Sequence, residues 1–243
     1  MAYPNSRCAV IRRGLPMTTA GSRSVDDPVV ALAGVGVNVG RTPVLRELDL
    51  QIRAGEVIGL VGPNGSGKST LLRVLATLLR PVGGTGRVLG ADLLSAQAAA
   101  VRPSIAPLGH EPSLYPRLTL AENLRFIARL TGRSESEAVR VLDAVGLAAA
   151  RDRRAVHCSH GMLRRAELAR VLLCAPRLLL LDEAHTGLDE SSSGLVDIVI
   201  DRVRGNSGAS VLVSHEPRRL LDVVDRVVLI ADGRTVPHAV ARP

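Results

Sequence analysis

Strand-like and helix-like patterns of apolar residues follow one another along this chain. Short apolar stretches separated by turns over 29–52 predict antiparallel strands. Beyond them, apolar runs typical of buried strands alternate with segments of helical period. The expected strands lie at 57–61, 86–89, 104–108, 177–181, 210–214 and 226–231, and the expected helices at 68–79, 159–174, 190–204 and 217–223. This alternation predicts an α/β fold with a mostly parallel sheet, which binds ligands at the carboxyl ends of its strands.

The middle of the chain, about 120–150, has a helical pattern without intervening strands. Thr119 and Ser134 precede its two helical stretches, and each is a residue type that caps a helix N-terminus. We therefore expect a helical insertion in the α/β core, forming a subdomain of about 92–165.

The two ends of the chain have a different composition. Residues 1–28 show no helix or strand period and are rich in Arg, Ser, Pro and Gly, which predicts a disordered extension. Met17 is an alternative translation start to Met1. The folded domain is expected at 29–236, with an antiparallel β subdomain at its N-terminal end and a tail at 237–243.

A glycine-rich segment lies between the predicted strand at 57–61 and the helix that follows it. It fits the phosphate-binding pattern G-x-x-x-x-G-K-[S/T] with the residues Gly62, Pro63, Asn64, Gly65, Ser66, Gly67, Lys68, Ser69 and Thr70. Glycines let the backbone N–H groups turn toward a phosphate chain at a helix N-terminus, where the helix dipole also favours anions. In this pattern Lys68 reaches the β- and γ-phosphates and Ser69 binds Mg²⁺. The strand before and the helix after argue against a chance glycine turn and predict a P-loop NTPase core.

Composition strengthens the assignment of Lys68. It is the only lysine among 31 basic residues, so a chain that otherwise uses arginine has a compact ammonium at this position. The net charge of +8 permits a nucleic-acid or membrane-surface partner, although solvated helix faces also account for it. With only three aromatic residues the chain lacks stacking platforms for single strands, and we expect no nucleic-acid partner. Three cysteines without zinc-site spacing indicate a reducing cytosol.

The predicted strand at 177–181 leads directly into two carboxylates, Asp182 and Glu183. A P-loop enzyme needs such an acidic strand end to complete its metal site. We expect Asp182 to bind Mg²⁺, directly or through water, and Glu183 to act as the general base for the attacking water. The other interpretation of adjacent carboxylates here is a helix N-cap pair.

Together these motifs resemble the ATP-binding subunit of an ABC (ATP-binding cassette) transporter. The resemblance rests on the glycine loop, on 178–183, on Thr186-Gly187-Leu188-Asp189 and on Val213-Ser214-His215-Glu216, and it spans about 29–236. It implies the cofactors ATP and Mg²⁺. It also implies that Asp189 belongs to a loop coupling two subunits, and that His215 contacts the γ-phosphate and orients the catalytic water.

The family's signature, L-S-G-G-Q, corresponds to Cys158-Ser159-His160-Gly161-Met162. Ser159 and Gly161 retain the hydroxyl and the backbone N–H that grip the γ-phosphate of ATP bound to the opposite subunit. The resemblance therefore implies a homodimer or heterodimer of ATPase subunits.

Other positions depart from the family pattern. His110 stands where a glutamine usually touches Mg²⁺ and senses the membrane partner, Ala184 replaces the proline after Glu183, and Val39 falls near the aromatic that usually stacks on adenine. The pair Gly109-His110 resembles ATPase subunits of the haem exporter of cytochrome c biogenesis. The surrounding motifs also fit drug and polysaccharide exporters.

The resemblance implies an ATP-hydrolysing subunit that powers transport through a separate integral membrane permease, at the cytoplasmic face of the membrane. No apolar run approaches the ~20 residues needed to cross a bilayer. Two alternatives are a degenerate ABC switch that binds nucleotide with little turnover, and a soluble ABC protein that acts on nucleic acid or ribosomes.

Overall fold

The structure is a computed structural model that describes residues 27–109, 111–183, 190–214 and 217–236. The extension expected at 1–28 lies outside the described residues except for its last two positions, and so does the tail at 237–243. The chain forms two compact units. The sheet unit contains the described residues of 27–109, 176–183 and 203–236, and the helical unit those of 111–175 and 190–202.

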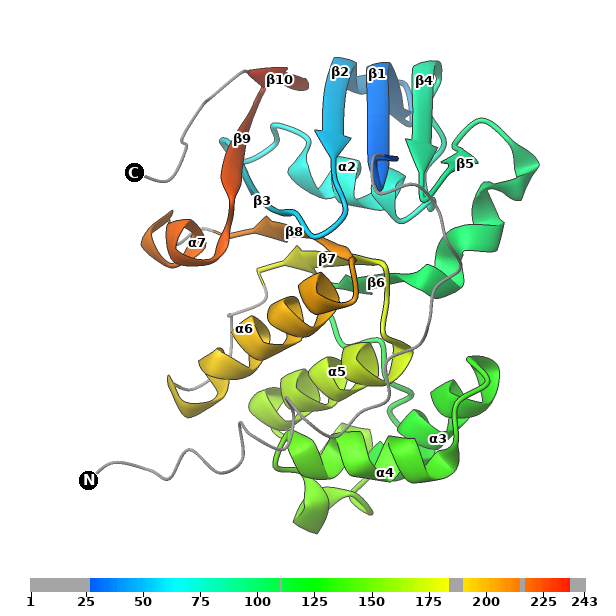
Figure 1. Ribbon diagram of the computed structural model, residues 1–243, viewed down its shortest axis with the longest axis vertical. Helices are drawn as coiled ribbons and strands as arrows, with labels where there is room; N and C mark the ends of the chain where they lie inside the picture. The colour runs from blue at the N-terminus through cyan, green and yellow to red at the C-terminus, as the bar shows by residue number, and fades with distance from the viewer. Residues whose placement is uncertain (1–26, 110, 184–189, 215–216, 237–243) are drawn as a thin grey trace. The chain divides into compact units, whose positions relative to one another are not determined.

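A six-stranded sheet forms the base of the sheet unit, in the order β10-β9-β3-β8-β7-β6 (Figure 1). Its five parallel strands are apolar and largely buried, as expected for a sheet covered on both faces, and β10 joins its edge antiparallel to β9. The strands are β3 (Val57–Val61), β6 (Ile105–Leu108), β7 (Leu178–Asp182), β8 (Ala209–Val213), β9 (Arg226–Ala231) and β10 (Arg234–Val236). The predicted mostly parallel sheet is thus confirmed.

A second, antiparallel sheet has the order β2-β1-β4-β5, which confirms the predicted antiparallel strands over 29–52. Its strands are β1 (Val30–Val39), β2 (Thr42–Ile52), β4 (Gly83–Val88) and β5 (Ala91–Asp92). A tight turn joins β1 to β2, because Val39 pairs with Thr42. The two sheets and helix α2 (Lys68–Leu75) share one hydrophobic core of leucine, valine and isoleucine.

Helix α2 is shorter than predicted. The pattern favoured a helix over 68–79, but α2 ends at Leu75, because Thr77 adopts a left-handed backbone conformation with φ of 58°. Arg102 stabilises that turn, since its guanidinium donates to the hydroxyl of Thr77 at 3.0 Å and to its carbonyl at 2.7 Å. Arg102 lies in the 3₁₀ helix η1 (Ala96–Ser104). Local periodicity does not reveal its contact with Thr77.

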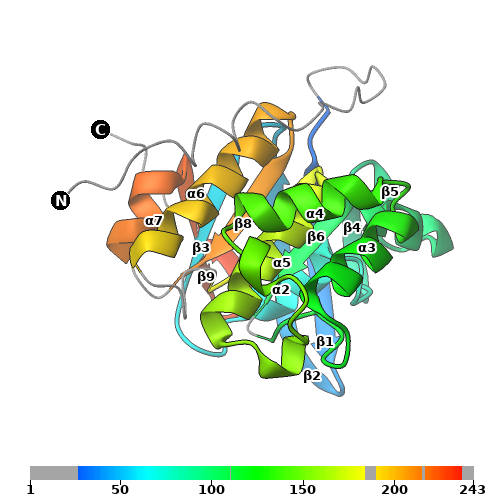
Figure 2. The same ribbon diagram turned by 90° about the horizontal axis from the view of Figure 1, so that it is seen from below.

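The helical unit is built on three helices that pack side by side (Figure 2). They are α3 (Leu120–Leu130), α4 (Glu135–Ala144) and α5 (His160–Cys174), with short 3₁₀ turns η2 (Ala148–Ala150) and η3 (Ala155–His157). Helices α6 (Glu190–Gly205) and α7 (Pro217–Val223) follow the predicted ranges closely. The helical unit includes all of α5, whereas residues 92–109 belong to the sheet unit. The limits of the helical unit therefore differ from those of the expected subdomain at 92–165.

Both predicted N-caps in the helical unit are confirmed as complete capping boxes. The Thr119 hydroxyl accepts from the Glu122 N–H at 3.1 Å, and the Glu122 carboxylate accepts from the Thr119 N–H at 2.7 Å. The hydrogen bond from the Thr119 backbone N–H lowers the pKa of the Glu122 carboxyl. Its stabilising effect is therefore present above the ordinary carboxyl pKa and is lost as the pH falls through the lowered value.

Replacing Thr119 with Ala should lower the free energy of unfolding by about 1 kcal/mol, because the Glu122 N–H loses its acceptor. Thr119→Ser keeps the hydroxyl and should stay close to the wild type. Urea denaturation followed by circular dichroism measures the difference. Equal stability of the Ala and Ser variants would contradict the role of this cap.

Candidate nucleotide-binding site

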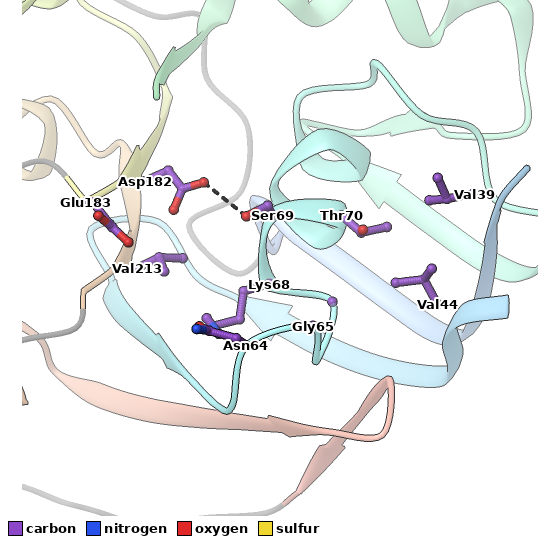
Figure 3. A pocket seen from close by; sticks show the side chains of 11 residues that line it. Val39, Val44, Asn64, Gly65, Lys68, Ser69, Thr70, Asp182, Glu183 and Val213 are labelled. Carbon is purple, nitrogen blue, oxygen red and sulfur yellow. Dashed lines mark hydrogen bonds between the residues drawn. The ribbon is translucent and has the colours of Figure 1, made fainter. Parts of the chain in front are cut away.

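The glycine loop connects the end of β3 to the first turn of α2, at the carboxyl end of a central parallel strand (Figure 3). At Gly62 the backbone has a φ of 151°, and a Cβ atom there would lie 2.2 Å from the carbonyl oxygen of Ile230 on β9. Only glycine therefore lets the loop pass this close to the neighbouring strand.

The N-terminus of α2 has no side-chain cap. Its N-cap is Gly67, in a left-handed conformation with φ of 105°, and its first turn contains no acidic residue. This contrasts with α3 and α4, whose N-termini are closed by capping boxes. A helix N-terminus without a side-chain cap presents backbone N–H groups and the positive end of the helix dipole to an anion, which suits a phosphate.

The Lys68 ammonium is held at the start of the loop. Its Nζ donates to the carbonyl oxygens of Gly62 at 2.7 Å and Pro63 at 2.9 Å. Because an ammonium has three donors, these bonds orient the group and leave one N–H for a ligand. The loop thus combines backbone donors with a fixed positive charge.

The two predicted metal ligands meet although they lie 113 residues apart in the sequence. The Ser69 hydroxyl donates to Oδ2 of Asp182 at 3.1 Å, drawn as the dashed line in Figure 3. Hydroxyl and carboxylate oxygens suit Mg²⁺, which usually takes one or two protein ligands together with substrate phosphates and waters. Among the described residues no cluster of three or more His, Cys, Asp or Glu could hold a metal ion.

Glu183 follows Asp182 at the end of β7 in a strained left-handed conformation, with φ of 55°. Its backbone N–H donates to the carbonyl of Val213 at 2.9 Å, which ties the turn to the end of β8. Glu183 contributes to the lining of the same cavity as Lys68 and Ser69.

One cavity of about 520 Å³ collects these groups within the sheet unit. Its lining comprises Val39, Val44, Asn64, Gly65, Gly67, Lys68, Ser69, Thr70, Asp182, Glu183 and Val213. Sequence reasoning did not identify Val44 and Val213 as cavity residues. An apolar strand residue carries no local signal of this kind, because its position depends on how the strands pack.

The remaining predicted site residues are placed differently. Ser159 is the N-cap of α5 in the helical unit, where its hydroxyl accepts from the Met162 N–H at 3.3 Å, and Gly161 lies in the first turn. His110, His215 and Asp189 lie outside the described residues. The roles of all three stay predictions.

The parallel sheet, the glycine loop and the Ser69–Asp182 pair define a P-loop nucleotide-binding domain of the α/β class. A family model described as "ABC transporter" matches residues 45–186. The daunorubicin/doxorubicin resistance ATP-binding protein DrrA of Streptomyces peucetius is 43% identical over 195 residues, covering 78% of this chain and 58% of DrrA. The cytochrome c biogenesis ATP-binding export protein CcmA of Bordetella parapertussis is 44% identical over 179 residues, covering 73% of this chain and 80% of CcmA.

A solved structure of an ATP-binding subunit of an ABC transporter has the same fold, with a TM-score of 0.78 and 26% identity over 85% of this chain and 88% of that one. The chain belongs to the ABC transporter family, as an ATPase domain that uses ATP and Mg²⁺. A dimeric solved structure of an ATP-binding cassette bound to ADP and phosphate has the same fold, with a TM-score of 0.77 and 22% identity over 86% of this chain and 97% of that one. The chain spans less than two thirds of the length of DrrA. In its described part, no helix has both the length and the apolar character needed to cross a membrane.

Gly62→Ala should lower the free energy of unfolding by about 2–5 kcal/mol, from backbone strain and the clash with the Ile230 carbonyl. Gly65→Ala is the matched control: its φ is also positive, at 80°, but nothing lies within 4 Å of the added Cβ. We expect about 1–2 kcal/mol there. Urea denaturation of both variants checks this, and equal losses would contradict the close approach of the loop to β9.

Proposed function

We propose that this chain is the ATP-binding and ATP-hydrolysing subunit of an ABC transporter and powers transport through a separate membrane permease. The observation that carries the proposal is the meeting of Lys68, Ser69, Asp182 and Glu183 in one cavity beside the uncapped N-terminus of α2. Positive charge, backbone donors and carboxylates are the groups that phosphoryl transfer requires.

Each residue has a distinct part in this proposal. The backbone N–H groups of 62–70 and the Lys68 ammonium bind the β- and γ-phosphates and hold the γ-phosphorus in place for attack. Ser69 and Asp182 hold Mg²⁺, which supplies neutralisation of the phosphate charge when bound. Glu183 accepts a proton from the attacking water, and the products are ADP and inorganic phosphate. His215 orients that water and contacts the γ-phosphate.

The second half of the site comes from another subunit in this proposal. Ser159 and Gly161, at the start of α5, supply a hydroxyl and backbone N–H groups to the γ-phosphate of ATP bound to the opposite chain. Two chains, identical or paralogous, then close over two ATP molecules, and hydrolysis reopens them. The permease holds the assembly at the cytoplasmic face of the membrane, and His110 takes the place of the family's glutamine that touches Mg²⁺ and senses the permease.

Glu183→Gln should reduce ATP hydrolysis by about 10²- to 10⁴-fold, because the attacking water loses its base. Since ATP still binds, this variant should accumulate as an ATP-bound dimer of roughly twice the monomer mass by light scattering. Lys68→Ala is the control and should give neither hydrolysis nor dimer. A wild-type rate equal to that of Glu183→Gln would instead support the degenerate switch, and a variant that stays monomeric with ATP would argue against the composite site.

For the cargo, we propose haem export for cytochrome c biogenesis. The support is the Gly109-His110 pair and the similarity to CcmA, which extends over 80% of the CcmA chain. Drug export is the second candidate, because the identity to DrrA is 43% over a longer stretch of 195 residues.

Deleting the gene in its native host separates these two cargoes. Under haem export, covalent haem staining of c-type cytochromes should disappear and should return with the wild-type gene but not with Lys68→Ala. Normal staining together with new sensitivity to anthracyclines would point to drug export instead.

A further inference from the structure

The last two strands of the sheet unit, β9 and β10, are joined by a tight turn that packs against β2 (Figure 1). Asp232 and Gly233 form this turn, since Ala231 pairs with Arg234. Both turn residues have a positive φ, 49° for Asp232 and 76° for Gly233, which is the combination of a type I′ turn. Asp-Gly is a favoured pair for such a turn, so the sequence specifies its shape locally.

Gly233 is buried at the point where the turn meets β2. A Cβ atom at this position would lie 2.2 Å from the Val44 carbonyl oxygen and 3.2 Å from the Leu45 Cα. The Gly233 carbonyl accepts a hydrogen bond from the Arg46 N–H at 2.8 Å. The turn therefore contacts the backbone of three successive residues of β2, and no side chain at position 233 fits unless β2 moves.

Two side chains extend this contact along β2. The Thr235 hydroxyl donates to the Asp49 carbonyl at 2.8 Å, and the Arg234 guanidinium lies 2.7 Å from the Glu47 carboxylate. The ion pair contributes little, because its side chains are 55% and 72% exposed. β2 is an edge strand of the antiparallel sheet, so the turn and the Thr235 hydroxyl fasten this edge to the six-stranded sheet.

The same residues of β2 pack on the N-cap of α2, at the end of the glycine loop. The Leu45 side chain is 1% exposed, and its Cδ2 lies 2.6 Å from the point that a Cβ of Gly67 would occupy. Val44 adds its Cγ1 at 3.4 Å and its carbonyl oxygen at 3.5 Å from that point. β2 therefore supports the end of the glycine loop by direct contact.

Both ends of the glycine loop thus rest on the C-terminal strands. Gly62 meets Ile230 of β9 directly, whereas Gly67 rests on Leu45, whose strand is contacted by Gly233. The backbone N–H groups that would bind phosphate lie between these two supports. Hydrogen bonds weaken steeply when donor and acceptor leave their optimal geometry, so phosphate binding depends on both supports staying in place.

Resting on the proposed function, we infer that Gly233 is a positioning residue for phosphate binding, because it lets the β9–β10 turn hold β2 against Gly67. Gly233 is not among the residues that line the cavity, so it acts through its neighbours. An added methyl group must move the Val44 carbonyl by roughly 1 Å to reach an ordinary carbon–oxygen contact distance. Leu45, the next residue, transmits this shift to Gly67.

Calorimetric titration of the full chain with MgADP tests this role, because it gives both the dissociation constant and the fraction of chains that bind. Gly233→Ala should weaken binding about 10- to 100-fold, as expected for a ~1 Å displacement of binding groups. Gly55→Ala is the matched control, since its φ is 77° and nothing lies within 4 Å of the added Cβ. It should bind within about twofold of the wild type.

A merely structural role for Gly233 would lower the binding fraction and the melting temperature but leave the dissociation constant of the folded chains unchanged. A dissociation constant for Gly233→Ala less than about fivefold above that of Gly55→Ala would therefore overturn the inference.

If Gly233→Ala does not fold, Thr235→Val and Thr235→Ser decide. The valine variant lacks the hydroxyl that fastens β2 and should bind MgADP about two- to fivefold more weakly than the serine variant, which keeps it. Equal binding by the two would overturn the inference. No binding of MgADP by the wild-type chain, or unchanged binding by Lys68→Ala, would instead overturn the proposed function.

Discussion

Between β3 and α2 the backbone passes so close to β9 that a methyl group at Gly62 would meet the Ile230 carbonyl. The same turn directs the Gly62 carbonyl toward the Lys68 ammonium, 2.7 Å away, and leaves the N-terminus of α2 without a side-chain cap. The placement of the positive charge, the start of the helix and the proposed binding of phosphate all depend on this one backbone path. The buried parallel sheet holds the path rigid, since β3 pairs with a neighbour on each side.

The carboxylates reach the loop through the order of the strands. β8 lies between β3 and β7, and all three strands run parallel. The end of β7 and the glycine loop therefore both lie at the carboxyl end of the sheet. Asp182 thereby comes within 3.1 Å of Ser69. Glu183, the next residue, has a left-handed conformation, and its backbone N–H donates a hydrogen bond to the Val213 carbonyl. That strain is stored where the chain must leave the sheet and still present a carboxylate to the cavity.

The chain divides its chemistry between two units. The sheet unit contains the glycine loop, the proposed metal ligands Ser69 and Asp182, and Glu183, whereas Ser159 and Gly161 belong to the helical unit. Capping boxes close the N-termini of α3 and α4, and the Ser159 hydroxyl caps α5 by accepting from the Met162 N–H. The proposed contact of Ser159 and Gly161 with the ATP of a second chain therefore falls at a helix N-terminus where the Ser159 hydroxyl already accepts one backbone N–H.

The sequence by itself determined the features that depend on neighbours along the chain. The glycine loop, the apolar strands, the caps at Thr119 and Ser134 and the α/β alternation all have local physical causes, and the structure contains them at or near the predicted residues. Family membership could also be predicted, because the motifs and their spacing are a linear pattern.

Only the tertiary structure decided what depends on residues distant in the sequence. α2 ends early at Leu75, beside Thr77, which Arg102 contacts from 25 residues further along the chain, and the 3.1 Å contact of Ser69 with Asp182 depends on the strand order. The aliphatic surface of Val39 and Val44 exists because β1 and β2 pair beside the loop. Sequence patterns report local periodicity and chemistry, whereas a cavity is made by packing, which brings together side chains that no local signal connects.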